Sequence, residues 1–278
     1  MPTSPTQPRR MKRLSDQSLS ELGGRLSVLA RQKSDHEELE VLLQRLEAAT
    51  WREQPEVLLP LYRLVFPHAF AEESVLWPVI RRTLPEGEQL TLQVEREHQE
   101  VNELVTTLEA LGPDSPERQL TLTRLAEVLR EDVRDEEDEL FPQLQARLSM
   151  GRLRTLGLTW EVVRRIAPTR AHPVVSRRPP GNVIAALPLT ALDRSRDRID
   201  RWLLQGTRPW AEGPLRSTQG LLERWAHAME HLAPLRAGED RSTAVRPKPT
   251  RGRLVWWCCG LFLVAAVVAL GRARLHRD

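Results

Sequence analysis

Two short segments of this chain repeat one pattern, and that pattern restricts the fold more than any other feature. Residues 68–78 read HAFAEESVLWP, and residues 132–142 read DVRDEEDELFP. Each segment begins with a polar residue, has a Glu-Glu pair starting four positions later, and ends in Leu, an aromatic residue and Pro. Residues four apart lie on one face of a helix. Both segments are therefore predicted to be helical and to present two polar side chains to one point.

Hydrophobic periodicity places both segments in a bundle. Leu and Val recur at helical spacing over four long stretches with short connections, at about residues 22–46, 55–82, 88–111 and 116–148. Helix-breaking sequences such as LPEG and Gly-Pro separate these stretches. The expected fold class is all-α: an up-down-up-down four-helix bundle, followed by extra helices and a C-terminal transmembrane helix.

Each predicted helix carries one polar residue on its apolar stripe. These residues are His36, His68 and His98 on the first three helices and Asp132 at the corresponding place on the fourth. Leu or Val residues lie three, four or seven positions away from each of them, on the face that a bundle buries. We therefore expect all four polar side chains to point into the bundle.

The glutamates of the repeated segments add carboxylates to this interior. Glu72 follows His68 by four residues, and Glu136 follows Asp132 by four. Burying ionised Glu72 and Glu136 without partners would be very costly, and cations between them would remove that cost. Imidazole and carboxylate ligands together suit iron, manganese or zinc, and two facing carboxylates suit a pair of ions.

A structural role is the alternative for each of these residues taken singly. A core histidine is often satisfied by a hydrogen bond, and a Glu-Glu pair is often solvated. Glu73 and Glu137, one position further round their helices, are interpreted as solvated residues. Tyr62 and Trp77 are interpreted as core packing residues and not as redox partners.

Taken in order, the segments around these residues resemble the hemerythrin-like, HHE cation-binding family. The matching segments are KSDHEELEVL around His36, HAFAEESVLWP, EREHQEV around His98, and DVRDEEDELFP. The resemblance covers about residues 26–150. It implies an up-down four-helix bundle that holds a non-haem di-iron centre.

The resemblance also implies a role for each position. It makes His36 and His68 terminal ligands of one iron and His98 a terminal ligand of the other. Glu72 and Glu136 would be bridging carboxylates. The cofactor that it implies is a pair of iron ions, with manganese or a single metal as alternatives.

Asp132 is the main departure from the family, which usually has His at this position. An aspartate can still ligate a metal and would favour oxidised ions, but its side chain is shorter than an imidazole. Either the second ion is held more weakly, for example through water, or the site holds one metal. Asn102 stands where oxygen-carrying hemerythrins have a further imidazole, so reversible oxygen binding is not implied.

Charge is unevenly distributed along the chain. Residues 35–142 contain 26 acidic residues against 10 arginines, a net charge of −16, whereas residues 147–181 contain eight arginines and one glutamate. The acidic stretch would repel phosphates, so no nucleic-acid partner is expected for the bundle. We interpret the basic RRPPG sequence as a packed or membrane-proximal surface, with an acidic-lipid or nucleic-acid contact as the alternative.

A hydrophobic run near the C-terminus predicts a membrane anchor. The 17 residues 254–270, LVWWCCGLFLVAAVVAL, carry no charge and stand between RGR and GRARLHRD. As a helix they would reach about 26 Å, near the short end of what spans a bilayer. The basic residues before this run, and the lack of an apolar stretch at the N-terminus, favour a single-pass C-terminal anchor with the main domain in the cytoplasm.

These observations divide the chain into six parts. We expect a disordered N-terminus, the hemerythrin-like bundle, an Arg- and Pro-rich segment with additional helices at about 189–204 and 215–232, a linker, a transmembrane helix and a basic tail. The corresponding boundaries are 1–16, 17–150, 151–235, 236–253, 254–271 and 272–278.

The functional hypothesis is a membrane-tethered di-iron protein that senses or scavenges oxygen, peroxide, nitric oxide or iron. No combination of nucleophile and base, and no nucleotide-binding loop, indicates an ordinary metabolic enzyme. Two alternatives remain open: a peroxide-decomposing di-iron enzyme, and a metal-free helical interaction module on the membrane. A further pair, His227 and His231, has one-turn spacing but no third ligand beside it, which disfavours a metal site there.

Overall fold

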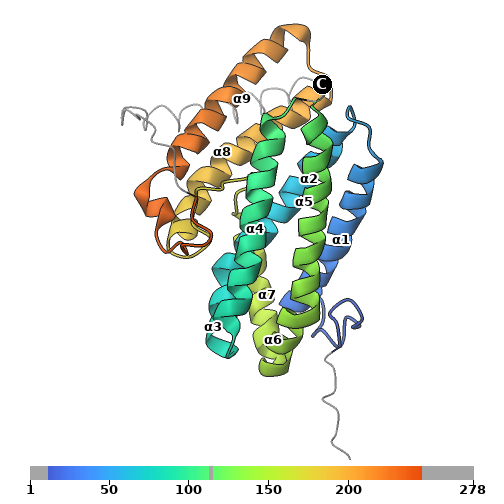
Figure 1. Cartoon of the computed structure of the whole chain (residues 1–278), viewed down its shortest axis with the longest axis vertical. Coiled ribbons are helices and arrows are strands. Elements are labelled where there is room, and N and C mark those ends of the chain that lie inside the picture. The colour runs from blue at the N-terminus through green and yellow to red at the C-terminus, as the bar shows by residue number, and fades with distance from the viewer. Residues whose placement is uncertain (1–11, 113–114, 246–278) are drawn as a thin grey trace, which may run out of the picture.

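Four helical rods stand side by side and form a bundle (Figure 1). The computed structural model describes residues 12–112 and 115–245, and within these ranges the chain is all-α, with no strand. The first and third rods are single helices, α1 (Val28–Ala48) and α4 (Gly87–Ala110). The all-α fold class is confirmed for the described residues.

The second and fourth rods each contain a π-helical turn. In both rods this turn separates a long helix from a short one of seven residues. The second rod consists of α2 (Gln54–Ala71), η1 (Glu72–Leu76) and α3 (Trp77–Thr83), and the fourth consists of α5 (Pro116–Asp135), η2 (Glu136–Leu140) and α6 (Phe141–Arg147). The rods thus follow the periodic stretches of the sequence to within a few residues.

The N-terminal segment departs from the prediction. The first helix begins at Val28 and not near Leu22, because Gly23 and Gly24 adopt positive φ angles of 93° and 84°, which end any helix there. Residues 12–27 form turns against the bundle, with Leu14 fully buried and Leu22 nearly so. The predicted disordered region of residues 1–16 therefore does not extend as far as Leu14.

The bundle has two hydrophobic cores, one toward each end, with polar residues between them. One core is centred on Leu43, Leu61 and Val105, and the other on Leu29 and Trp77. The two clusters occupy different stretches of every rod, and His36, His68, His98 and Glu136 lie between these stretches. Apolar layers on both sides therefore separate the polar residues from solvent along the bundle axis.

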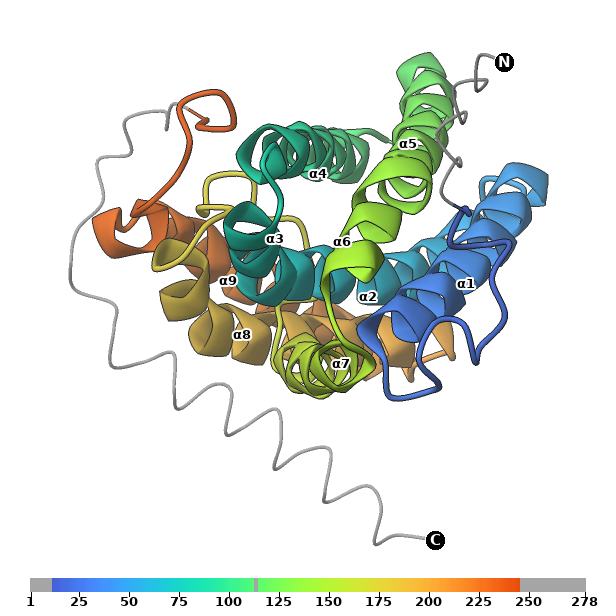
Figure 2. The same cartoon turned by 90° about the horizontal axis from the view of Figure 1, so that it is seen from below.

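A fifth helix that the sequence analysis did not identify packs against the bundle. Helix α7 (Met150–Arg165) lies across α1 and α2, at the side opposite α4 (Figure 2). Its Gly157 sits so close to the start of α1 that a Cβ atom would come within 2.1 Å of the Leu26 carbonyl oxygen. The buried Trp160 of α7 belongs to the same core as Leu29 and Trp77.

Two further helices form a layer beside the bundle. They are α8 (Gly181–Leu204) and α9 (Pro209–Glu230), followed by a short 3-10 turn, η3 (Ala233–Arg236). They pack on each other through their own hydrophobic core, and α8 contacts α2 through the ion pair of Arg63 with Asp197 at 2.7 Å. Helix α8 begins eight residues earlier than predicted.

The predicted membrane anchor lies outside the part of the chain that the structure describes. Within residues 12–112 and 115–245, no helix has the length and apolar character needed to cross a bilayer. The predicted linker of residues 236–253 is described as far as residue 245, where it forms turns beside α4.

Candidate metal centre

Three histidines and three carboxylates from four rods meet between the two cores. In one half of this centre His36 of α1 and His68 of α2 lie with their rings 5.3 Å apart. The Nε2 atom of His36 is 3.2 Å from a carboxylate oxygen of Glu136, and the Nε2 atom of His68 is 3.1 Å from one of Glu72. Two ligands of one octahedral ion, each about 2.1 Å from it, are about 3 Å apart, so these separations suit a shared ion.

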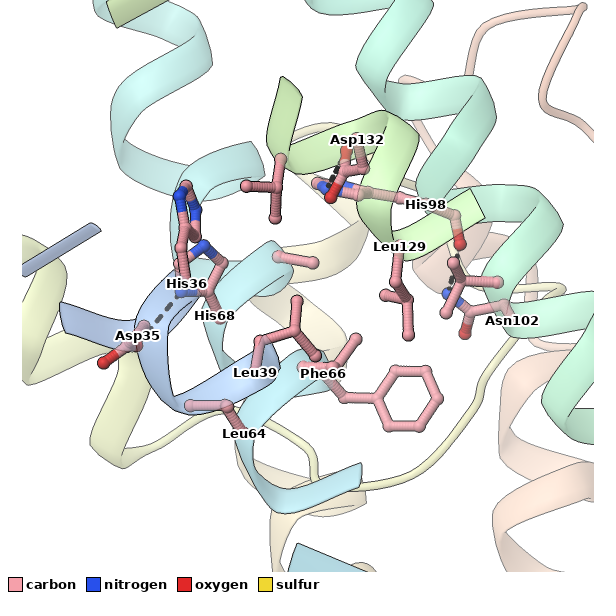
Figure 3. A pocket seen from close by; sticks show the side chains of 14 residues that line it. Asp35, His36, Leu39, Leu64, Phe66, His68, His98, Asn102, Leu129 and Asp132 are labelled. Carbon is pink, nitrogen blue, oxygen red and sulfur yellow. Dashed lines mark hydrogen bonds and ion pairs between the residues drawn. The ribbon is translucent and has the colours of Figure 1, made fainter. Parts of the chain in front are cut away.

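The other half is formed by α4 and α5. His98 Nε2 lies 3.7 Å from a carboxylate oxygen of Glu72 and 3.5 Å from Asp132 Oδ1, and His98 and Asp132 lie beside each other, away from His36 and His68 (Figure 3). The aspartate therefore does reach the centre, although its side chain is shorter than an imidazole. Oδ1 of Asp132 lies near the ligand atoms of His98 and Glu72. It is not part of the compact group that these atoms form with Glu136.

The ligand atoms form two compact groups that share one glutamate. Within each group all the atoms lie within 4.8 Å of one another. One group is His36, His68 and Glu136, and the other is Glu72, His98 and Glu136. Glu72 also lies beside His68 of the first group. Carboxylates shared between two such groups are the arrangement of bridging ligands in di-metal bundles.

The π-helical turns explain why the chain uses the same motif twice. In η1 the backbone N–H of Trp77 donates to the carbonyl of Glu72, and in η2 the N–H of Phe141 donates to that of Glu136, both five residues back. The proline that follows each aromatic residue has no N–H to continue the normal α-helical pattern. The wider turn keeps both consecutive glutamates inside, with exposed fractions of 0% for Glu72 and 1% for Glu73.

The second glutamate of each motif orients a histidine on another rod. Glu73 lies 3.0 Å from Nδ1 of His98, and Glu137 lies 2.9 Å from Nδ1 of His36. A carboxylate on the outer nitrogen of a metal-binding histidine fixes the ring and raises the basicity of the inner nitrogen. The interpretation of Glu73 and Glu137 as solvated residues was wrong, because the π-helical turn brings both of them inside.

The aromatic residue of each motif completes the same unit. Trp77 stacks on the ring of His98 with centroids 6.2 Å apart, and Phe141 stacks on His36 at 6.3 Å. Each motif therefore supplies an inner glutamate for the centre, an outer glutamate for one histidine and an aromatic ring for the same histidine. Tyr62, predicted to be a packing residue, is buried in the core around Leu43.

His68 is oriented by a residue outside the motifs. Its Nδ1 lies 3.0 Å from Oδ2 of Asp35, on the preceding helix. All three histidines thus use Nδ1 for a carboxylate and direct Nε2 toward the centre. No sequence pattern indicated this role for Asp35, because it lies on α1 and its partner His68 lies on α2. For Glu73 and Glu137 the repetition of the Glu-Glu pair was the available signal.

The inner atoms of this centre are buried without hydrogen-bond partners in the described part of the chain. They are Nε2 of His36 and His98, Oδ1 of Asp132 and both carboxylate oxygens of Glu72 and of Glu136. Unpaired buried polar atoms are costly, and a native structure has few of them. Seven such atoms directed at one place fit metal ions between them, so the residues present suit a di-metal group.

The electrostatics of the centre lead to the same conclusion. Burial raises the pKa of Glu136, and the nearby Glu72 carboxylate raises it further; burial also raises the pKa of Asp132 well above its usual range. Burial lowers the pKa of His36 and of His98, but the surrounding carboxylates outweigh it and raise these values to about 9 and about 10. The site thus favours positive charge, as protons or as metal ions that displace them.

Comparison with known proteins agrees with this geometry. Residues 27–144 match the model of the hemerythrin HHE cation binding domain. The match spans α1 to α6, which supply every ligand described above. Residues 27–144 are therefore similar to a hemerythrin HHE cation-binding domain.

Two known proteins are similar to part of this chain. An uncharacterized hemerythrin-like protein of Schizosaccharomyces pombe is 26% identical over 136 residues, which are 49% of this chain and 67% of that protein. A protein of Nostoc sp. named DNA nickase is 30% identical over 118 residues, which are 42% of this chain but 33% of that protein. No solved structure gives a significant match to the chain. The helices from α7 onward lie outside the family match.

All six residues proposed from the sequence as metal ligands lie at the hemerythrin-like centre. They are His36, His68, Glu72, His98, Asp132 and Glu136. Asn102, at the position of the missing imidazole, is turned away from the centre: its side-chain amide donates to the backbone carbonyl of His98. His227 lies on α9 and His231 directly follows its last residue; their Nε2 atoms are 3.3 Å apart, and the pair takes no part in this centre.

Proposed function

We propose that the hemerythrin-like domain binds two iron ions and acts as a sensor or scavenger of a small ligand such as oxygen, peroxide or nitric oxide. Two observations carry this proposal: seven inner ligand atoms have no hydrogen-bond partner among the described residues, and two compact groups of ligand atoms share Glu136. His36 and His68 would hold one ion, His98 and Asp132 the other, and Glu72 and Glu136 would bridge. Manganese is the alternative metal for this donor set.

The residues around the centre favour small, weakly polar ligands. A cavity of about 20 Å³ lies beside the three histidines, enough for one molecule of about the size of water. Apart from the ligands, Asp35 and Asn102, its walls are apolar and include Leu39, Phe66 and Leu129 (Figure 3). Bound iron would supply one-electron chemistry toward such a ligand. The protein itself orients the ligating nitrogens, excludes bulk water and restricts the size of what can enter.

The metal content and visible spectrum of the full-length chain, purified aerobically, test this proposal. We expect about two irons per chain, and loss of both iron and absorption in His36→Ala and Glu136→Ala. His227→Ala is the matched control, because this exposed histidine lies outside the centre. Protein that stays metal-free after anaerobic iron loading would refute the proposal and favour a metal-free interaction module. Catalytic decomposition of peroxide by the iron form would indicate an enzyme.

We also propose that residues 254–271 tether the domain to a membrane, with the bundle in the cytoplasm. The support is the uncharged run of 17 residues between basic flanks. Cell fractionation tests this directly. The full chain should be in the membrane fraction and should resist extraction by carbonate, whereas a chain ending at residue 250 should not. Equal distribution of the two chains would contradict the tether.

A further inference from the structure

Two arginines from beyond the family match reach the outer side of the metal centre. They are Arg164 on α7 and Arg177 in the segment between α7 and α8. Each contacts a carboxylate that itself contacts one of the centre's histidines. The family match ends at residue 144, so residues outside this match take part in the surroundings of the centre.

Arg164 acts on the side of His68. Its Nη1 donates to Oδ2 of Asp35 at 3.2 Å, and the same oxygen lies 3.0 Å from Nδ1 of His68. Arg164 also lies over the ring of Trp160, with its guanidinium carbon 5.1 Å from the ring centroid. Trp160 in turn meets the ring of His68 edge-on at 5.4 Å. Helix α7 therefore covers His68 and fixes the carboxylate that orients it.

Arg177 acts on the side of His98. Its Nη1 lies 3.8 Å from Oε1 of Glu73, and that oxygen lies 3.0 Å from Nδ1 of His98. The arginine is buried, and its Nη2 donates to the backbone carbonyls of His172 and Val175 at 2.9 and 3.1 Å. These hydrogen bonds hold the guanidinium in place beside Glu73.

We propose that Arg164 and Arg177 are positioning residues for the metal centre, each holding the carboxylate that orients one metal-binding histidine. This inference rests on the proposed metal binding. A buried carboxylate needs a fixed hydrogen-bonding or charged partner to keep one orientation and its negative charge. The arginine supplies that partner, and the carboxylate passes the constraint to the histidine ring. Arg164 thereby supports the ion held by His36 and His68, and Arg177 supports the ion held by His98.

The chain offers a matched control beside each arginine. Arg165 follows Arg164 but pairs with Glu161 at 2.7 Å, away from the centre. Arg178 follows Arg177 but pairs with Glu95 and Glu88 at 2.7 and 2.8 Å. Each control removes the same charge and at least one ion pair from the same segment. Neither control changes a contact to Asp35 or Glu73, the carboxylates that Arg164 and Arg177 hold.

The test compares iron affinity, measured by chelator competition, in the full-length chain and in Arg164→Gln, Arg165→Gln, Arg177→Gln and Arg178→Gln. We expect Arg164→Gln and Arg177→Gln to lower the affinity for one of the two ions by about tenfold, the lower end of the effect of losing an outer partner. Arg165→Gln and Arg178→Gln should stay within about twofold of the unchanged chain. Equal affinities within each adjacent pair would overturn the inference.

Two further measurements keep the result unambiguous. Arg164→Lys and Arg177→Lys retain the charge and should recover most of the lost affinity. If a Gln variant does not fold by circular dichroism, the Met variant at the same position replaces it. Met variants whose iron affinity and spectrum are as unchanged as those of the Lys variants would overturn the inference. Failure of the unchanged chain to bind iron would instead refute the proposed function. Normal binding by all variants would refute only the role of the two arginines.

Discussion

The two halves of the metal centre are built from the same motif but are held differently. From its glutamates onward, the motif at 68–78 and the motif at 132–142 have the same π-helical turn, the same outer glutamate and the same stacked aromatic ring. They differ at the first residue. His68 is oriented by Asp35 and covered by Trp160 of α7, whereas Oδ1 of Asp132 has no hydrogen-bond partner among the described residues.

From this difference we predict that repetition of the motif does not make two equal metal sites. The half with His36 and His68 has two imidazoles, each fixed through Nδ1 by a carboxylate. The half with His98 has one such imidazole, and the carboxyl group of Asp132 stands beside it. We therefore expect two ions of unequal affinity, with the one at His36 and His68 bound more tightly.

Glu136→Ala should have the largest effect, because Glu136 belongs to both halves. It should weaken both ions by more than about a hundredfold, beyond the range for outer partners. Glu139→Ala, an exposed residue of the same turn, is the control. Loss of one ion alone would contradict a bridging position.

The segment that carries His172 lies beside the His98 half, and its contribution to folding stability should depend on pH. His172 donates its backbone N–H to Asn102 of α4, and its ring lies between Asp193 and Glu230. Burial lowers the pKa of His172, but the effect of the two carboxylates is larger and raises this pKa to about 10. A raised folded-state pKa gives stability that is present below about pH 6.5 and is lost as pH rises toward 10.

Thermal unfolding of the metal-free chain at several pH values measures this effect. From pH 6 to pH 9 the contribution of His172 should fall by an amount on the order of 3 kcal/mol. His172→Gln has no charge to lose and should remove this part of the pH dependence. A variant that loses stability as steeply as the parent between these pH values would show that His172 is neutral in the folded protein.

Helix α7 covers His68, and the stability that it contributes should depend on close packing instead of pH. Gly157→Ala would place a methyl group within 2.1 Å of the Leu26 carbonyl and push α7 away from α1. We expect a loss of about 1–3 kcal/mol in the free energy of unfolding, measured with denaturant. At Gly151 in the same helix the nearest atom to an added Cβ is Ser149 Oγ at 4.0 Å, an ordinary contact, so Gly151→Ala should be neutral or slightly stabilising. Equal stability of the two variants would contradict the close approach.

Asp132→His tests the inequality of the two ions most directly and should have the smallest effect. An imidazole at this position would make the second half resemble the first and remove one negative charge. We expect the affinity of the weaker ion to rise by about tenfold, with the tighter ion unchanged. Isothermal titration with ferrous iron under anaerobic conditions would show the two binding steps converge. Steps that are already equal in the parent chain would contradict the comparison above.

The bundle and its inner ligands were predictable because both depend on periodicity along the chain. The apolar spacing gave the four rods, and the i, i+4 pairs placed His68 with Glu72 and Asp132 with Glu136 on single faces. The outer partners were not predictable in the same way. Asp35, Arg164 and Arg177 contact residues on other helices, and no spacing rule relates them to the centre.

The sequence by itself thus determined the all-α bundle and which six residues line its centre, because helical geometry turns spacing into direction. Only the tertiary structure decided which carboxylate orients which histidine, and that Glu73 and Glu137 face inward. The physical reason is that a π-helical turn shifts the direction of every side chain in it, and contacts between helices depend on packing that local sequence does not encode. The same packing places α7 over one half of the centre and leaves the other half to the segment that carries His172 and Arg177.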